Sequence, residues 1–159
     1  MPRPKSLLVG VISDTHGLVR PEALAALADC DHILHAGDVG DEPVLDALRG
    51  CAPVTAVRGN TDTGTCGLRL PETALVRFAA VTVFLIHDVL RLRLDPQAEG
   101  IDVVVYGHSH MALNETISGV LRFNPGSAGP RRFDRPATIG RLRIRGRRVA
   151  GEIVTLRVR

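Results

Sequence analysis

The 159-residue chain has few of the residues on which several common protein classes depend. Its three cysteines are an odd number without a Cys-x-x-Cys pair, which fits neither a disulfide framework nor a thiolate zinc site. It has no tryptophan, one tyrosine and four phenylalanines, so base-stacking platforms for single-stranded nucleic acid have little to be built from. We therefore expect Cys30, Cys51 and Cys66 to be small core residues.

Other missing features exclude further functional classes of protein. The only lysine is Lys5 and no Gly-x-x-x-x-Gly-Lys-Ser/Thr run is present, which excludes P-loop nucleotide hydrolysis. A Gly-x-Ser-x-Gly elbow for serine-hydrolase chemistry is also missing. No apolar run approaches the roughly 18 residues of a membrane span, and the run at 7–12 has no small-residue cleavage site after it. We expect that run to be a buried strand, and the protein to be cytoplasmic with no membrane partner.

What the chain does contain is typical of one globular domain. Apolar residues make up 45% of it and charged residues 23%, and no break in composition separates two units, so we predict a single domain over 1–159. Two segments are predicted to be helices. Residues 21–28 have a proline followed by strong helix formers, and residues 41–50 begin with acidic residues and end with a glycine. Short apolar, β-branched runs indicate buried strands at 6–12, 32–36, 53–57, 81–86 and 101–106.

The remainder, after Met111, is strand-rich, with turns indicated at 118–119, 124–126 and 146–147. Ten of the nineteen arginines lie between 131 and 159. Since Arg141, Arg143 and Arg145 alternate with apolar residues, they share one side of a predicted strand. We favour a solvated hairpin face, and keep a nucleic-acid-binding module as an alternative. The whole pattern predicts a mixed α/β sandwich.

Each of the five predicted buried strands ends in, or is soon followed by, a polar residue able to bind a metal. In α/β sheets, ligands sit in the crevice outside the carboxyl ends of the strands, so five separate segments can deliver side chains to one place. Glycine precedes three of these residues, as a close approach of the backbone to an ion requires. The candidate ligands are Asp14, His16, Asp38, Asn60, His87, His108 and His110.

These donors are carboxylate, amide and imidazole groups without thiolate, a mixture suited to Mn, Fe, Zn or Ni. Seven ligands are enough for two ions, and Asp38 between Gly37 and Gly40 could bridge a pair about 3.5–4 Å apart. His108 and His110 alternate along an extended segment, so both would face the site. His32 and His35 are expected to be ordinary satisfied polar residues outside the site.

The order of these segments along the chain resembles that in the calcineurin-like metallophosphoesterases. Within that family, the resemblance is to the small bacterial and archaeal phosphodiesterases that are related to the retromer subunit of vacuolar sorting. The resemblance rests on Asp-x-His at 14–16, Gly-Asp at 37–38, Gly-Asn-x-Asp at 59–62, His87, Gly-His-Ser-His at 107–110 and Asn-Pro-Gly-Ser at 124–127. It implies a four-layer αββα sandwich of two mixed sheets flanked by helices. It also implies one divalent metal on Asp14, His16, Asp38 and His110, and another on Asp38, Asn60, His87 and His108, with Mn expected.

Three departures from the family pattern stand out. Thr61 occupies the position where many relatives have a histidine that acts as a general acid or holds phosphate, Asp88 stands where glycine is usual, and Ser109 replaces threonine. Asp62 could orient a histidine ligand from behind or anchor its own loop. Arg58 and Arg131 are candidate phosphate clamps beside motif loops, and Asn60 also contacts substrate in this reading.

The resulting hypothesis is hydrolysis of a small phosphate ester by a hydroxide that two metals hold and activate. Because no general acid is evident, phosphodiesters or esters with good leaving groups are the expected substrates. Nucleic acid would enter only as a substrate, and a homo-oligomer is left open. The alternative from another class is a metal-binding interaction scaffold like the retromer subunit, although every ligand position here holds a competent residue.

Overall fold

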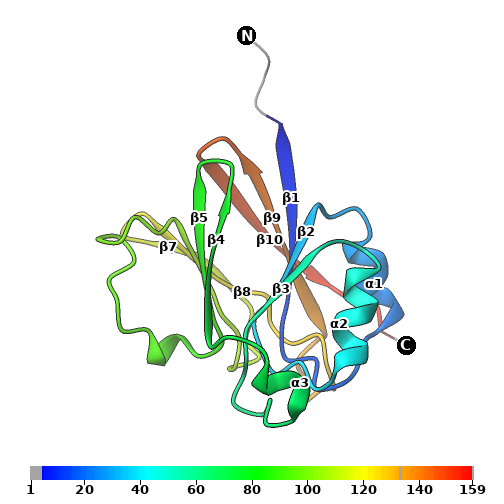
Figure 1. Ribbon diagram of the computed structural model, residues 1–159. Coiled ribbons are helices and arrows are strands. Elements are labelled where there is room, and N and C mark those ends of the chain that lie inside the picture. Colours follow the sequence, from blue (N-terminus) through cyan, green and yellow to red (C-terminus); the bar gives the residue numbers. More distant parts are fainter. Residues whose placement is uncertain (1–4, 133, 159) are drawn as a thin grey trace.

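The computed structural model describes residues 5–132 and 134–158 (Figure 1). Two five-stranded sheets form the fold, with strand orders β10-β9-β1-β2-β3 and β4-β5-β6-β8-β7. The first sheet contains β1 (Ser6–Ile12), β2 (His32–His35), β3 (Val54–Ala56), β9 (Thr138–Arg145) and β10 (Arg148–Thr155). The second contains β4 (Thr73–Phe78), β5 (Val81–Ile86), β6 (Val103–Val105), β7 (Leu113–Ile117) and β8 (Val120–Asn124).

Each sheet has three parallel strands at its centre or edge and antiparallel strands beside them. β1, β2 and β3 run parallel, and the β9–β10 hairpin joins β1 antiparallel. In the second sheet β5, β6 and β8 run parallel, and β4 and β7 form antiparallel edges. The carboxyl ends of the parallel strands in each sheet therefore lie together at the same end of that sheet.

Helices cover the outer face of the first sheet (Figure 1). α1 (Pro21–Leu27) begins with a proline whose missing N–H needs no partner there, and α2 (Glu42–Arg49) follows the extended Asp41. Their apolar sides, including Leu27, Leu45 and Leu48, pack in one cluster with Ile12 and Ile33 of the sheet. A third, four-residue helix, α3 (Thr65–Leu68), follows the loop after β3.

The outer face of the second sheet is covered differently. A connection over residues 88–101, with one 3₁₀ turn η1 (Val89–Arg91), lies against it and buries Ile86, Val104 and Tyr106 together with Ile101. The predicted sandwich of two mixed sheets is confirmed, and within the described residues the second helical layer is reduced to this connection. None of the helices described is long and apolar enough to cross a membrane.

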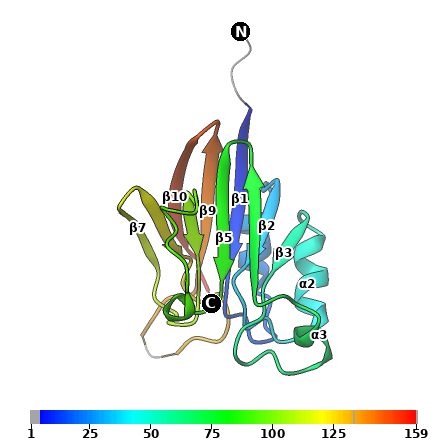
Figure 2. The same ribbon diagram turned by 60° about the vertical axis from the view of Figure 1, so that its left-hand side comes forward.

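The main core lies between the two sheets (Figure 2). Period-two alternation produces it: in β9, Leu142 and Ile144 are fully buried while Arg143 and Arg145 are exposed, as the sequence pattern predicted. Arg141 lies on the same face of β9 as Arg143 and Arg145. It pairs with Asp29, which follows α1, at nitrogen–oxygen distances of 2.9 and 3.0 Å.

Most of the predicted elements are present, and two were missed. All five buried strands and both helices appear within a few residues of the expected bounds, and turns at 118–119 and 146–147 close the β7–β8 and β9–β10 hairpins. β4 and α3 were not foreseen. The expected turn at 124–126 makes no hairpin: β8 ends at Asn124 and the chain then crosses from the second sheet to the first.

Phe123 of β8 links the two sheets. It is fully buried, and its ring lies over two glycines of the opposite sheet. A Cβ atom on Gly140 would lie 2.2 Å from one ring carbon, and one on Gly151 would lie 2.7 Å from another. The ring therefore fills space that exists only because β9 and β10 carry glycine there.

We expect Phe123→Ala to lower the free energy of unfolding by about 3–5 kcal/mol, because it leaves a ring-sized cavity between the sheets. Phe78→Ala, at a partly exposed ring on β4, is the matched control and should cost less than about 2 kcal/mol. Urea unfolding followed by circular dichroism measures both. Equal losses in the two variants would show that Phe123 has no special part in joining the sheets.

Candidate metal centre

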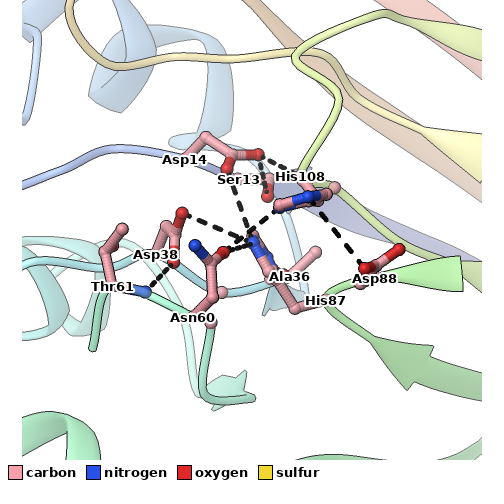
Figure 3. A network of polar contacts seen from close by, with 12 residues as sticks. Ser13, Asp14, Ala36, Asp38, Asn60, Thr61, His87, Asp88 and His108 are labelled. Atoms are coloured by element: carbon pink, nitrogen blue, oxygen red, sulfur yellow. Dashed lines mark hydrogen bonds and ion pairs between the residues drawn. The ribbon is translucent and has the colours of Figure 1, made fainter. Parts of the chain in front are cut away.

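The seven predicted ligands converge on one place. Asp14 and His16 follow β1, Asp38 follows β2, Asn60 follows β3, and His87 follows β5. His108 and His110 follow β6, in a loop that Asn124 at the end of β8 contacts. Figure 3 shows Asp14, Asp38, Asn60, His87 and His108 directed toward one another. The two sheets thus deliver side chains to a common cluster from opposite sides.

The backbone of these loops is unusual. Five of the seven ligands have a positive φ: 56° at Asp14, 47° at His16, 55° at Asp38, 70° at His108 and 61° at His110. Non-glycine residues adopt this region rarely, and each such residue costs on the order of 1–3 kcal/mol unless its surroundings hold it in place. Because these left-handed residues are concentrated at one cluster, we infer that the loops adopt this backbone conformation in order to bring the side chains together.

The glycines that precede ligands leave no room for a side chain. A Cβ on Gly37 would lie 2.6 Å from the His87 ring, one on Gly59 would lie 2.1 Å from Asp38 Oδ1, and one on Gly107 would lie 2.7 Å from Asp14 Oδ2. Only Gly37 of these three also has a positive φ, 101°. Close approach of the strands, more than backbone freedom, is the reason for glycine at the other two.

The four imidazoles form two pairs. The ring centroids of His16 and His110 lie 5.6 Å apart, and those of His87 and His108 lie 5.2 Å apart. Both carboxylates contact members of the two pairs. Asp38 Oδ2 is 3.4 Å from His87 Nε2 and 3.8 Å from His16 Nε2, while Asp14 Oδ1 is 3.3 Å from His110 Nε2 and 3.9 Å from His87 Nε2.

Each carboxylate has one oxygen held by the protein and one left for the cluster. Asp14 Oδ2 accepts hydrogen bonds from the Ser13 hydroxyl at 2.7 Å and from the His108 N–H at 3.1 Å. Asp38 Oδ1 accepts the Thr61 N–H at 2.9 Å. The other oxygens, Asp14 Oδ1 and Asp38 Oδ2, are the ones that face the histidines.

His87 shows what the cluster requires. Its Nδ1 lies 2.7 Å from the carbonyl oxygen of Ala36, which can only accept, so Nδ1 carries the hydrogen. In the neutral ring Nε2 is then a lone pair, and it faces Asn60 Oδ1 at 3.0 Å and Asp38 Oδ2 at 3.4 Å. A positive charge among these acceptors, either a metal ion or a proton on Nε2, would relieve their contact. Burial opposes that proton, but the neighbouring Asp38 and Asp14 outweigh it and raise the pKa of His87.

Two buried atoms lead to the same requirement. Asp14 Oδ1 and His16 Nε2 are buried without a hydrogen-bond partner among the described residues. Buried polar atoms are normally paired, so each such atom needs an explanation. Two groups with mutual spacings within 4.8 Å could hold an ion, namely Asp14 with His16 and His110, and Asp14 with Asp38 and His87. The residues present therefore fit divalent metals that prefer oxygen and nitrogen donors.

The carboxylates of the cluster are ionised at neutral pH. Burial alone would raise the pKa of Asp14, but contacts with His110 and Ser13 outweigh it and hold that pKa below its usual value. Burial also opposes ionisation of Asp38, whose pKa is nevertheless held far below its usual range by His87 and the Thr61 N–H. Negative charge in a buried site is what a divalent ion would neutralise.

Asp62 anchors the loops behind the ligands. Its buried carboxylate accepts the N–H groups of Gly59 at 2.9 Å, Gly40 at 3.1 Å and Val39 at 3.2 Å. Of the two roles expected for this residue, the geometry supports loop anchoring, since these bonds join the Asp38 loop to the Asn60 loop. None of its hydrogen bonds among the described residues goes to a histidine.

The Asn-Pro-Gly-Ser segment supports the cluster from the other side. Asn124 Nδ2 donates to the Gly107 carbonyl and to Ser109 Oγ, both at 3.1 Å, and so holds the loop that carries His108 and His110. The Ser127 hydroxyl donates to the Asp14 carbonyl at 3.1 Å. Ser109, which replaces the usual threonine, therefore keeps a hydroxyl that Asn124 uses.

The remaining sequence candidates lie around the rim. Asp88 accepts the Leu90 N–H at 3.0 Å and its Oδ2 lies 4.0 Å from His108 Nε2. Arg131 lines a small cavity that His110 also lines, and Arg58 pairs with Glu72 at 3.2 Å. Cys66 donates to Glu42, and burial raises the pKa of its thiol to about 11, so it is an unreactive thiol.

His35 is a residue whose role the sequence reading missed. It is fully buried, its Nδ1 accepts the Gly37 N–H at 3.1 Å, and its Nε2 donates to the Thr15 hydroxyl at 2.9 Å, which in turn donates to the Val39 carbonyl at 2.7 Å. These bonds join the loops on either side of Asp14 and Asp38. A histidine at the last position of a buried strand was the available signal.

Comparison with known proteins identifies the family. Residues 7–147, most of the chain, match the calcineurin-like phosphoesterase superfamily domain. The chain belongs to this superfamily. The resemblance drawn from the sequence motifs is thereby confirmed.

This calcineurin-like phosphoesterase has relatives over most of its length. A probable metallophosphoesterase of Methanothermobacter thermautotrophicus is 36% identical, covering 93% of this chain and 92% of the relative. Phosphodiesterase YfcE of Escherichia coli K12 is 32% identical, covering 82% and 84%. Among solved structures, vacuolar protein sorting 29 from Cryptosporidium parvum has a TM-score of 0.79 at 22% identity, covering 96% and 92%, which shows the shared fold. The family is one of metal-dependent phosphoesterases.

The hydrogen bonds of His35 predict a pH dependence of stability. Burial lowers its pKa from 6.5 to about 4, so the folded protein binds this proton less well than the unfolded chain. The contribution to stability is therefore complete above about pH 6.5 and is lost as the pH falls toward 4, amounting to about 3 kcal/mol.

The variant His35→Gln carries a side chain that does not titrate. We expect the native protein to lose about 2–3 kcal/mol of unfolding free energy relative to this variant when the pH is lowered from about 7 to about 4.5. Urea titrations of metal-free protein measure it, and the other titrating groups cancel in the difference. A difference that stays constant with pH would show that His35 is not held neutral.

Proposed function

We propose that this chain is a phosphodiesterase that works with two divalent metal ions, Mn being the expected one and Fe, Zn or Ni the alternatives. The observation that carries the proposal is the mutual arrangement of acceptors at His87, Asp38, Asn60 and Asp14, whose many contacts divalent ions would satisfy together. Membership of the calcineurin-like phosphoesterase superfamily supports the same activity.

The ligand assignment we propose places Asp38 between the two ions. One ion would be held by Asp14, His16, Asp38 and His110, and the other by Asp38, Asn60, His87 and His108. Asp38 Oδ2 lies within 3.8 Å of one histidine from each pair, which supports bridging by this oxygen. Asp14 belongs to both groups of candidate ligands but uses its second oxygen for Ser13 and His108, so it suits a terminal position.

When bound, such ions would supply Lewis acidity, which activates water at neutral pH and neutralises the charge on a phosphate. The chain's own groups hold the geometry. Asn60 and His108 are the exposed members of the cluster, so they would orient a phosphate that enters from solvent. The buried Asp14 and Asp38, kept ionised by their hydrogen bonds, hold the negative charge of the site behind them.

The preference for diesters follows from the groups near the leaving oxygen. Thr61 replaces a histidine that could donate a proton, and its N–H is used by Asp38. Asp62 accepts three backbone N–H groups, so both of its oxygens are used in holding the loops. Substrates whose leaving group needs no proton should therefore react best. The relative named as a phosphodiesterase supports this choice.

Two alternatives remain distinct hypotheses. A metal-binding scaffold is suggested by the fold shared with vacuolar protein sorting 29, and the strained backbone at five candidate ligands would suit metal binding without turnover as well. A nucleic-acid-binding module would use the arginine face of β9, where Arg141 is already paired with Asp29. The single domain, the cytoplasmic location and any homo-oligomer stay predictions.

The activity test is release of 4-nitrophenolate from bis(4-nitrophenyl) phosphate with and without added Mn. We expect metal-dependent turnover in the native protein and a loss of at least about 100-fold in Asp38→Ala, because that change removes the proposed bridge. Asp46→Ala removes an exposed carboxylate on α2 and should retain the native rate.

Turnover in Asp38→Ala close to the native rate would contradict the proposal, as would equal losses in both variants. Metal binding by the native protein without hydrolysis of any ester would favour the scaffold.

A further inference from the structure

A groove adjoins the metal cluster on the side of the second sheet. This groove is a cavity of about 750 Å³ that continues along the outer face of the second sheet. Its lining includes the three residues proposed as ligands of one ion alone, namely Asn60, His87 and His108. This volume lies within the range of about 300–1,000 Å³ that is typical of small-molecule sites. A phosphate on the cluster would occupy only the end of such a groove, so the rest is available to a substituent of the ester.

The floor and one wall of the groove are apolar. Phe84 and Ile86, which alternate with core residues along β5, line it from the sheet, and Leu92 and Leu94 line it from the 88–101 connection. Phe84 and Leu94 also pack against the buried cluster beneath the connection, which holds them in place. A flat apolar group could therefore lie between the sheet and the connection.

The charges of the groove are predominantly positive. Arg58 is paired with Glu72 at 3.2 Å, and Asp88 is used by the Leu90 N–H and faces His108. The other two arginines of the lining, Arg91 and Arg93, are exposed, and among the described residues no carboxylate lies within 4.0 Å of either. Two guanidinium groups free for an anion thus border the apolar floor.

We propose that this groove binds one ester substituent of the substrate, and that the substituent combines a flat apolar ring with a second phosphate group, as in a nucleotide. The inference rests on the phosphodiesterase function proposed above and names its substrate class. The ring packs on Phe84 and Leu92, and the second phosphate pairs with Arg91 and Arg93, whose forked N–H groups match phosphate oxygens. Small alkyl diesters leave the groove empty.

Three esters with one leaving group test the proposal. Methyl 4-nitrophenyl phosphate reports the reaction without a groove substituent, thymidine 5′-(4-nitrophenyl phosphate) adds a ring, and its 3′-phosphorylated form adds the second phosphate. We expect kcat/KM to rise along this series, the last step by about 10-fold or more through a lower KM. The double variant R91Q/R93Q should lose that last step and keep the native kcat for the methyl ester.

The double variant R143Q/R145Q is the matched control, since it removes the same charge from the exposed face of β9. It should retain the native preference for the 3′-phosphorylated ester, and an equal loss there would overturn the groove in favour of long-range charge. An unchanged KM in R91Q/R93Q would overturn the groove as well. Failure of the native protein to hydrolyse any of the three esters with Mn would overturn the phosphodiesterase function itself.

A measurement without variants completes the test. Thymidine 3′,5′-bisphosphate should inhibit the native protein competitively, with an inhibition constant about 10-fold or more below that of thymidine 5′-phosphate. Equal constants would contradict a second phosphate site even if the variants failed to fold.

Discussion

Repulsion among closely spaced acceptors is the constraint on which this structure depends. Asp14, Asp38, Asn60 and His87 direct oxygens and a nitrogen lone pair at one another, and Ala36 fixes the tautomer of His87 so that its Nε2 cannot relieve the conflict in the neutral ring. A proton can satisfy one such contact, whereas divalent ions satisfy many at once. Metal binding should therefore contribute directly to the stability of the folded state.

The fold keeps this arrangement in place by means that are themselves unfavourable. Left-handed backbone at five ligands and glycine at three close approaches would not persist in isolated loops. Asp62, Asn124, Ser127 and His35 hold the loops through hydrogen bonds to backbone groups. Most of these supports bind main chain, so they fix where the ligands stand without occupying the atoms that face the ions.

The sequence predicted which side chains come together because they share one simple property: each follows a buried strand, and the carboxyl ends of parallel strands meet at one end of a sheet. It predicted part of the support, since Asp62 was expected to anchor its own loop. His35 was read only as a satisfied polar residue, because a lone histidine in a strand gives no sign of which loops will cross beside it. The groove was missed for a similar reason: Phe84, Arg91 and Leu94 belong to β5 and an irregular connection whose periodicity indicates no common surface. Short-range patterns identify strands and their ends, whereas contacts between loops depend on tertiary packing.

The most direct test of the metal centre is a crystal structure of the protein grown with Mn, with anomalous scattering measured at the manganese edge. We expect two peaks about 3.5–4 Å apart, with Asp38 contacting both, His16 and His110 contacting one, and His87 with Asn60 contacting the other. An empty cluster in which His87 Nε2 is instead protonated and bonded to Asp38 would contradict it, because a proton alone would then resolve the conflict among the acceptors.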